Sequence, residues 1–88
     1  MNPTHYLQTE VQNATGQSCI GAADLWEESP PTLSPGTFFP SVWSDQTKEI
    51  LQSATTLKLT DGRKFVLVDL EKKEIENGGG YYNFQYQA

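Results

Sequence analysis

The chain has 88 residues, 36% of them hydrophobic and 19% charged, which is typical of one small globular domain. Eleven acidic residues against six basic ones give a net charge of −5, which disfavours non-specific binding to nucleic acid or anionic membranes. No segment has the roughly 20 consecutive apolar residues of a membrane-spanning helix, and the N-terminus lacks the pattern of a signal peptide. The single cysteine, Cys19, excludes an internal disulfide, so we expect a reducing, cytoplasmic location.

The first quarter of the chain predicts a β-hairpin. Residues 6–12 alternate between apolar and polar side chains, which indicates a strand with Leu7 on its buried face. The composition of 13–16 indicates a turn, and we expect 17–22 to return as the second strand. A short helical turn over 22–28 is an alternative for the segment that follows.

An irregular, aromatic and proline-rich loop is expected at about 23–40. Most of the prolines lie here, and each biases the residue before it away from helical conformations. The segment also contains Trp26, Phe38 and Phe39, and Trp43 follows it closely. Because these residues are apolar, we expect the loop to wrap over the sheet and close part of the core.

A short helix is predicted at about 44–53. Ser41 or Ser44 is a suitable N-cap, and Asp45 lies in the first turn, where a negative charge is favourable. Apolar side chains recur at helical spacing within the segment. A helix this short owes its stability to packing, so we expect it to dock on one face of the sheet.

The strongest local signal is the pair Asp61-Gly62, which lies between strand-like runs at 55–60 and 63–70 and predicts a hairpin. A two-residue loop and a type I turn with a glycine bulge both fit this pair, and they differ by one residue in pairing register. Residues 65–68 are apolar on both sides, which favours a central strand with neighbours on both edges and cover on both faces.

The chain ends in a further predicted strand at 81–87, in which Tyr82, Phe84 and Tyr86 alternate with polar residues. The last three strands are expected to form a meander, because sequential strands usually pair. The first strand then adds to one edge of that meander. The predicted fold class is α+β, a single domain over 1–88 with an antiparallel sheet of four to five strands (about 6–12, 17–22, 55–60, 63–70 and 81–87) and one short helix (about 44–53) on one face.

No pattern for catalysis, cofactor binding or metal binding is present in the sequence. Cys19 and His5 are the one conceivable thiol–imidazole pair, and we expect a structural role for the cysteine. Asp24, Glu27 and Glu28 match no calcium-loop spacing, so they are interpreted as a solvated acidic cluster. A small enzyme that uses Cys19 or a pair of carboxylates is retained as the alternative function.

The aromatic C-terminal strand also permits a nucleic-acid interpretation. Tyr81, Tyr82, Phe84 and Tyr86 are residue types on which single-stranded bases stack. Such platforms lie in basic grooves, and the acidic balance of this chain disfavours one. The opposite reading, an acidic mimic of nucleic acid, is weakened because the carboxylates are scattered along the chain.

The leading hypothesis is a non-catalytic protein–protein interaction module, a small acidic adaptor or inhibitor that binds another protein. Ten aromatic residues are many for so small a core, and exposed Tyr and Trp side chains are typical of binding hot spots. The C-terminal strand is also expected to offer an edge for pairing with a partner strand or with a second copy. The candidate partner-binding residues are Trp26, Phe38, Phe39, Trp43, Tyr81, Tyr82 and Tyr86.

Overall fold

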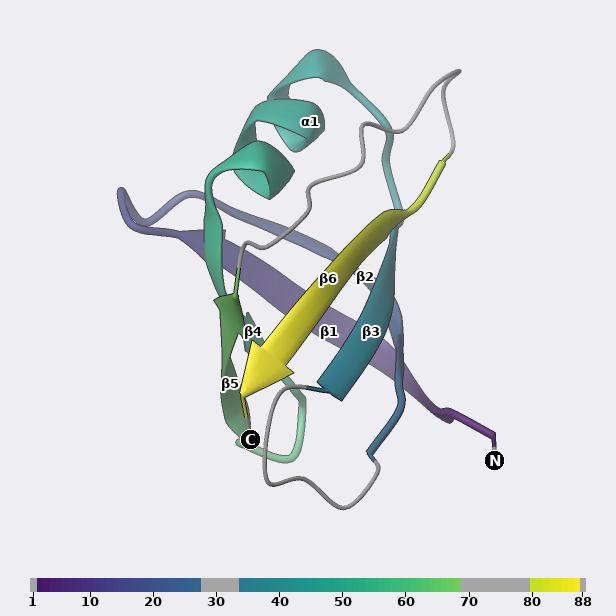
Figure 1. The fold of residues 1–88 in the computed structure, drawn as a ribbon. Helices are drawn as coiled ribbons and strands as arrows, with labels where there is room; N and C mark the ends of the chain where they lie inside the picture. The colour runs from purple at the N-terminus through teal and green to yellow at the C-terminus, as the bar shows by residue number, and fades with distance from the viewer. Residues whose placement is uncertain (1, 28–33, 69–79, 88) are drawn as a thin grey trace.

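The computed structural model describes residues 2–27, 34–68 and 80–87, which form a closed antiparallel barrel of six strands with one short helix (Figure 1). Around the barrel the strands follow the order β1-β2-β3-β6-β5-β4, so two meanders are joined along β3–β6 and along β1–β4. The elements are β1 (Thr4–Asn13), β2 (Ser18–Leu25), β3 (Ser34–Pro40), α1 (Asp45–Gln52), β4 (Ala54–Lys58), β5 (Lys64–Val68) and β6 (Tyr82–Gln87).

The prediction of an open sheet of four or five strands is wrong, and the reason is β3. The prolines of this segment favour the loop predicted at 23–40. Proline removes a backbone donor but is tolerated near strand ends, and Pro35 and Pro40 are the second and last residues of β3. β3 pairs with β2 on one side and with β6 on the other, and these two ladders close the barrel.

Closure also removes the free C-terminal edge on which pairing with another strand was expected. β6 is hydrogen-bonded to β3 through residues 82–86 and to β5 through 85–87. A closed barrel has no continuous exposed edge that could template such pairing. The expected self-pairing through β6 is therefore contradicted by the fold.

The hairpin at Gly62 forms with the glycine-bulge geometry. Leu59 accepts from the backbone N–H of Gly62 at 3.1 Å and donates to Arg63 at 2.9 Å, and Gly62 has a φ of +97°, which favours glycine. In this register Leu57 lies opposite Phe65. Side chains at odd positions of β5 therefore point inward, and Val66 is 56% exposed. The expected neighbours on both edges of β5 are present, but the expected cover on both faces is wrong; residues 69–70 lie outside the described part.

The core fills the interior of the barrel with side chains from every strand. Neighbouring aromatic rings from β5 and β6 lie inside, with the centroids of Tyr82 and Phe84 5.6 Å apart and those of Phe65 and Tyr86 5.0 Å apart. Apolar burial of this kind is the main stabilising contribution in a domain of this size. The buried cluster consists of Val11, Ala23, Leu25, Phe38, Leu51, Ala54, Leu57, Leu59, Phe65, Leu67, Tyr82, Phe84 and Tyr86.

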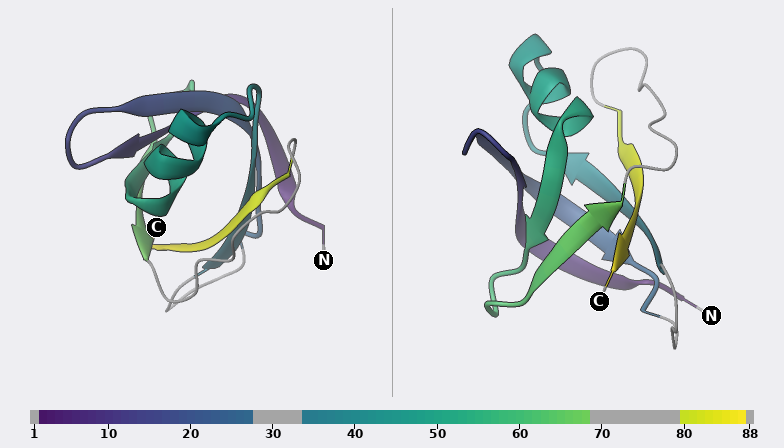
Figure 2. Two further views of the ribbon diagram at one scale, coloured as in Figure 1. Left: turned by 90° about the horizontal axis from the view of Figure 1, so that it is seen from above. Right: turned by 60° about the vertical axis from the view of Figure 1, so that its left-hand side comes forward.

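The predicted helix forms, but it lies across one end of the barrel rather than on the face of an open sheet (Figures 1 and 2). The hydroxyl of Ser44 accepts from the backbone N–H of Thr47 at 3.1 Å, so Ser44 is the N-cap. The side chains of Thr47, Ile50 and Leu51 form the buried face of the helix. α1 has eight residues, and no helix in the described segments is long and apolar enough to cross a membrane.

β1 contains a β-bulge that changes which side chains reach the surface. Tyr6 lies opposite Ala23 and Thr9 lies opposite Gly21, so two residues of β1, Leu7 and Gln8, match one residue of β2. Gln8 has a φ of +57°, an uncommon backbone conformation for a residue other than glycine. Leu7, which we expected on the buried face, is consequently 68% exposed.

Candidate partner-binding surface

The seven residues predicted to bind a partner divide by the direction of their side chains. Phe38, Tyr82 and Tyr86 point into the barrel and are 0%, 4% and 1% exposed, so they belong to the core and offer no surface. Phe39 and Tyr81 point outward and are 39% and 50% exposed. Trp26 and Trp43 are half-buried, and Trp43 packs against the core.

The exposed aromatic residues belong to an apolar row that crosses four strands. Phe39 of β3 lies opposite Ala22 of β2, and its ring lies 6.2 Å from that of Tyr81, which precedes β6. On the other side of Ala22, the bulge of β1 presents Leu7. Ile20 is 58% exposed and lies two residues before Ala22, on the same face of β2. We call Leu7, Ile20, Ala22, Phe39 and Tyr81 the outer-face patch.

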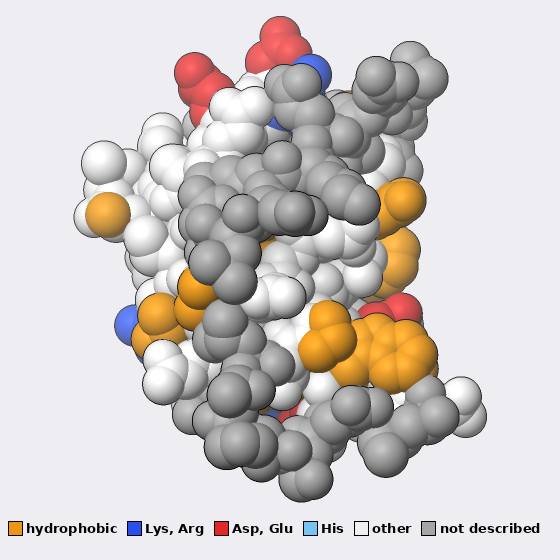
Figure 3. Space-filling model, viewed as in Figure 1, with side chains coloured by type: hydrophobic (Ala, Val, Ile, Leu, Met, Phe, Trp, Pro, Cys, Tyr) orange, Lys and Arg blue, Asp and Glu red, His pale blue; other side chains and the backbone are white. Residues whose placement is uncertain are grey.

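The space-filling view shows the front of the barrel, with β6 toward the viewer and β1 behind it. Hydrophobic side chains gather along the side of the molecule on which β2 and β3 run (Figure 3). The largest apolar patch on a monomer is often functional. Sequence reasoning identified Phe39 and Tyr81 but missed Leu7, Ile20 and Ala22. Leu7 was missed because a bulge at a non-glycine residue leaves no sequence signal.

Two carboxylates border the outer-face patch among the described residues, since Glu10 of β1 lies opposite Ile20 and Asp24 lies two residues after Ala22. Asp24 is the one charged residue on the outer faces of β2, β3 and β6, and it forms an ion pair with His5. Nearby, the hydroxyl of Thr37 donates to the side-chain oxygen of Asn83 at 2.9 Å. Lys58 and Lys64 lie opposite one another on β4 and β5, away from the patch.

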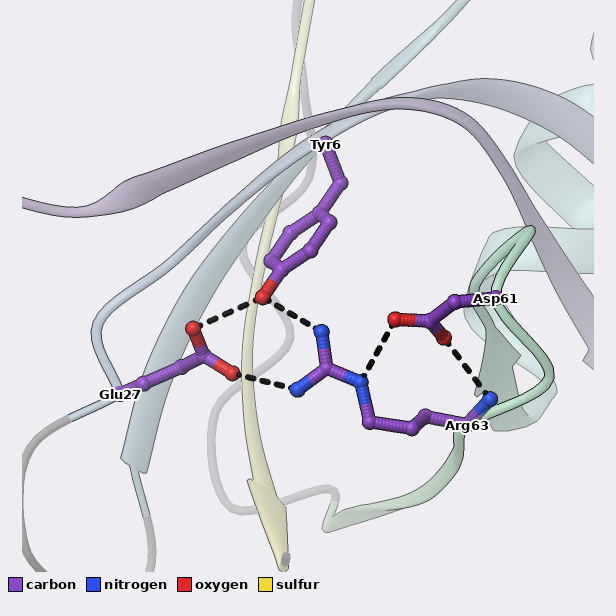
Figure 4. A network of polar contacts seen from close by, with 4 residues as sticks. All are labelled: Tyr6, Glu27, Asp61 and Arg63. Atoms are coloured by element: carbon purple, nitrogen blue, oxygen red, sulfur yellow. Dashed lines mark hydrogen bonds and ion pairs between the residues drawn. The ribbon is translucent and has the colours of Figure 1, made fainter.

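A separate polar cluster lies at the end of the barrel that α1 does not cover (Figure 4). The guanidinium of Arg63 donates to the Tyr6 hydroxyl at 2.7 Å, to Glu27 at 3.1 Å and to Asp61 at 2.9 Å. It also lies 5.2 Å from the centroid of the Tyr6 ring, a cation–π distance. These contacts connect the β4–β5 turn to β1 and to the residues after β2.

The contacts in the cluster shift the pKa values of its members, and each charged side chain in it is engaged by another member. Burial and the hydrogen bond to Glu27 raise the pKa of Tyr6. The backbone N–H of Arg63, which donates to the side chain of Asp61, lowers the pKa of that carboxyl. Each charged side chain is already bonded within the cluster. We therefore interpret the cluster as a structural contact that holds the β4–β5 turn against β1. Exposed pairs of this kind contribute little to stability individually.

The buried hydroxyl of Tyr86 lies close enough to this end of the barrel to respond to its charges. It is the one buried side-chain oxygen or nitrogen of the described residues that has no hydrogen bond of ordinary geometry, although the hydroxyl of Ser34 lies near it. Burial raises its pKa, the carboxylate of Glu27 acts in the same direction, and the hydroxyl of Ser34 acts against them. Tyr86 therefore stays neutral at physiological pH and is a core residue with a polar tip.

The residues considered for catalysis and for metal binding are not brought together. Cys19 lies opposite Val11, whereas His5 lies opposite Asp24 much farther along the same ladder. Asp24 is paired with His5, Glu27 is held by Tyr6 and Arg63, and Glu28 lies outside the described residues. Within the described segments, no group of three His, Cys, Asp or Glu residues is placed to hold a metal ion.

The Cys19 thiol is expected to react slowly with alkylating reagents. Burial, assisted by the charge of Glu10, raises its pKa to about 11 from 9.0. Because the thiolate is the nucleophile, its fraction at neutral pH falls roughly 100-fold for a pKa two units higher. Iodoacetamide labelling, followed by mass spectrometry from pH 7 to 11, should accelerate throughout this range. Labelling as fast as that of the urea-unfolded chain would contradict the raised pKa, and only faster labelling would indicate an activated thiol.

Comparison of the chain with protein-family models, curated proteins and solved structures finds no match. The function is therefore argued from the surface itself, since a barrel architecture does not specify a function.

Proposed function

We propose that the protein is a non-catalytic interaction module, an adaptor or inhibitor that binds another protein through the outer-face patch. The observation that carries the proposal is the continuity of the patch. Leu7, Ala22, Phe39 and Tyr81 are neighbours across four strands, and three of them are large apolar side chains with 39% to 68% of their surface exposed. Scattered apolar side chains need no explanation, whereas a contiguous row of them favours an interface.

The chemistry of the patch supports a protein as partner better than a nucleic acid. Aromatic side chains are enriched at protein interfaces, where charged residues are depleted from the centre. Phosphate backbones need lysine or arginine, and the described outer faces of β2, β3 and β6 carry neither. In addition, Tyr82, Phe84 and Tyr86 are buried, so they cannot stack with bases on the surface.

Site-specific photocrosslinking tests the proposal. A benzophenone amino acid is placed at Phe39 or at Tyr81, and the exposed Lys64 on β5 is the control position. We expect irradiation in the native host to give adducts of the same defined masses from positions 39 and 81. Position 64 should not give them, and the substitution Ala22→Lys should abolish them. Equal adducts from all three positions, or none from 39 and 81, would contradict the proposal.

A further inference from the structure

Two exposed aromatic rings lie side by side on the β3–β6 part of the outer-face patch. The rings of Phe39 and Tyr81 have centroids 6.2 Å apart and planes inclined by 50°, and these residues are 39% and 50% exposed. The small side chain of Ala22 lies opposite Phe39 on β2. β1, which carries Leu7, lies behind β6 in Figure 1, so one flat surface cannot contact the whole patch. We call Phe39 and Tyr81 the aromatic pair.

The surface around the aromatic pair is small for a folded partner domain. The exposed parts of Ile20, Phe39 and Tyr81 amount to roughly 300 Å², whereas a standard interface buries about 800 Å² on each partner. A short segment of a partner protein needs less area, provided that it loses little conformational freedom on binding. A polyproline II segment meets this condition, because its extended conformation is already populated in the free chain.

The fold disfavours the other common ways of recognising a short segment at this place. A partner strand needs an unpaired edge, and β3 is hydrogen-bonded to β2 on one side and to β6 on the other. A partner helix needs an apolar groove, whereas the outer side of this barrel is convex (Figure 2). Proline-rich segments instead dock against aromatic side chains, whose ring faces are apolar.

Asn83 supplies a hydrogen-bond donor beside the aromatic pair. It lies two residues after Tyr81, and its side-chain oxygen accepts from the hydroxyl of Thr37 at 2.9 Å. This bond orients the amide, and its Nδ2 group has no partner among the described residues, so it can donate to a ligand. The carbonyl groups of polyproline II have no internal partner and therefore accept from such a donor.

The charges near the aromatic pair favour basic residues in the segment. Glu10 lies opposite Ile20 on one side and Lys58 on the other, and it forms no ion pair with Lys58 in the described part of the chain. Asp24 is paired with His5. The described outer faces of β2, β3 and β6 carry no lysine or arginine, and the chain has a net charge of −5. A basic segment is therefore attracted to this surface and an acidic one is repelled.

We propose that the aromatic pair binds a short proline-rich segment that carries lysine or arginine and adopts the polyproline II conformation. The inference rests on the proposed function and assigns the kind of segment that the partner presents. Proline rings pack against Phe39 and Tyr81, Asn83 donates to a backbone carbonyl of the segment, and Glu10 attracts its basic residue. Because the contact is small, we expect a dissociation constant on the order of 10–100 µM.

Fluorescence anisotropy of labelled synthetic peptides, titrated with the full chain, tests the inference. The probe consists of three Pro-Pro-Leu repeats between two arginines. Replacing its prolines by serine should weaken binding at least about tenfold, because the free peptide then lacks a preformed conformation. Replacing its arginines by glutamate should weaken binding at least about threefold at low salt.

Variants of the protein locate the site. Phe39→Ala and Tyr81→Ala should each weaken binding of the probe at least about tenfold. The matched control is Val66→Ala, which removes an apolar side chain that is 56% exposed on β5. Asn83→Ala should weaken binding about threefold, with Gln87→Ala as its control on the same strand. Circular dichroism checks that each variant folds.

The inference is overturned if the probe does not bind at millimolar concentration. Equal binding of the serine or the glutamate peptide would overturn it as well, and so would binding that is indifferent to both Phe39→Ala and Tyr81→Ala. If the probe does not bind but benzophenone at positions 39 and 81 still gives defined adducts, the proline-rich segment is excluded while the proposed function stands.

Discussion

Replacing Gly21 by alanine is expected to lower the free energy of unfolding by at least about 3 kcal/mol, because this position has no room for a methyl group. A Cβ at Gly21 would lie 2.1 Å from the carbonyl oxygen of Phe39 and 2.8 Å from the Cα of Pro40. Both are backbone atoms of the neighbouring strand, so relief requires β2 and β3 to separate. Glycine within a strand often marks such a close approach of two backbones.

Urea unfolding followed by tryptophan fluorescence measures this effect, since Trp26 directly follows β2 and Trp43 follows β3. With a stability margin of about 4–13 kcal/mol for a chain of this length, the loss is a large share of the total. Gly16→Ala is the matched control. Gly16 has a φ of +91° with nothing within 4 Å of the added Cβ, so it should cost only about 1 kcal/mol. If Gly21→Ala were no more destabilising than Gly16→Ala, the β2–β3 pairing would be wrong.

The parts of the fold that the sequence predicts are those determined by neighbouring residues. Gly62 supplies the left-handed conformation of the β4–β5 turn, and Ser44 supplies the helix cap, so the hairpin and α1 were both expected. Alternating residues likewise identified β6. In each case the energetic preference acts over a few residues and leaves a pattern in the sequence.

The closure of the barrel depends on contacts that leave no such local pattern. β3 includes Pro35, Gly36 and Pro40, each disfavoured in strands, and it forms because β2 and β6 lie on either side of it. The candidate surface was predicted in part for the same reason. Phe39 and Tyr81 were identified as aromatic residues, but only the register shows that they are neighbours. Leu7 depends on the bulge at Gln8, which pairing with β2 selects.

Asn13 joins three parts of the barrel that are far apart in the sequence. Its side-chain nitrogen donates to the side chain of Gln17 and to the hydroxyl of Ser53, both at 3.1 Å. Its side-chain oxygen accepts from the hydroxyl of Thr15 at 2.8 Å and from the backbone N–H of Gln17 at 2.9 Å. Asn13 is only 7% exposed, and Ser53 is the C-cap of α1. The amide thus fixes the β1–β2 turn and fastens it to the helix that covers the barrel end.

Asn13→Ala is therefore expected to destabilise the protein by about 2–3 kcal/mol, since it removes four hydrogen bonds worth about 0.5–1.5 kcal/mol each, partly offset by solvation of the freed groups. Asn13→Asp should cost at least as much, because a carboxylate keeps both acceptor bonds but loses the donors and places a charge at a site that is only 7% exposed. Ser53→Ala removes a single bond to Asn13 and should cost about 1 kcal/mol or less. Thermal unfolding followed by circular dichroism should show both Asn13 variants melting below Ser53→Ala. In a domain of this size, 1 kcal/mol corresponds to about 4–8 °C in melting temperature. A melting temperature of Asn13→Ala within about 2 °C of the parent would therefore show that the turn and α1 are not coupled through this amide.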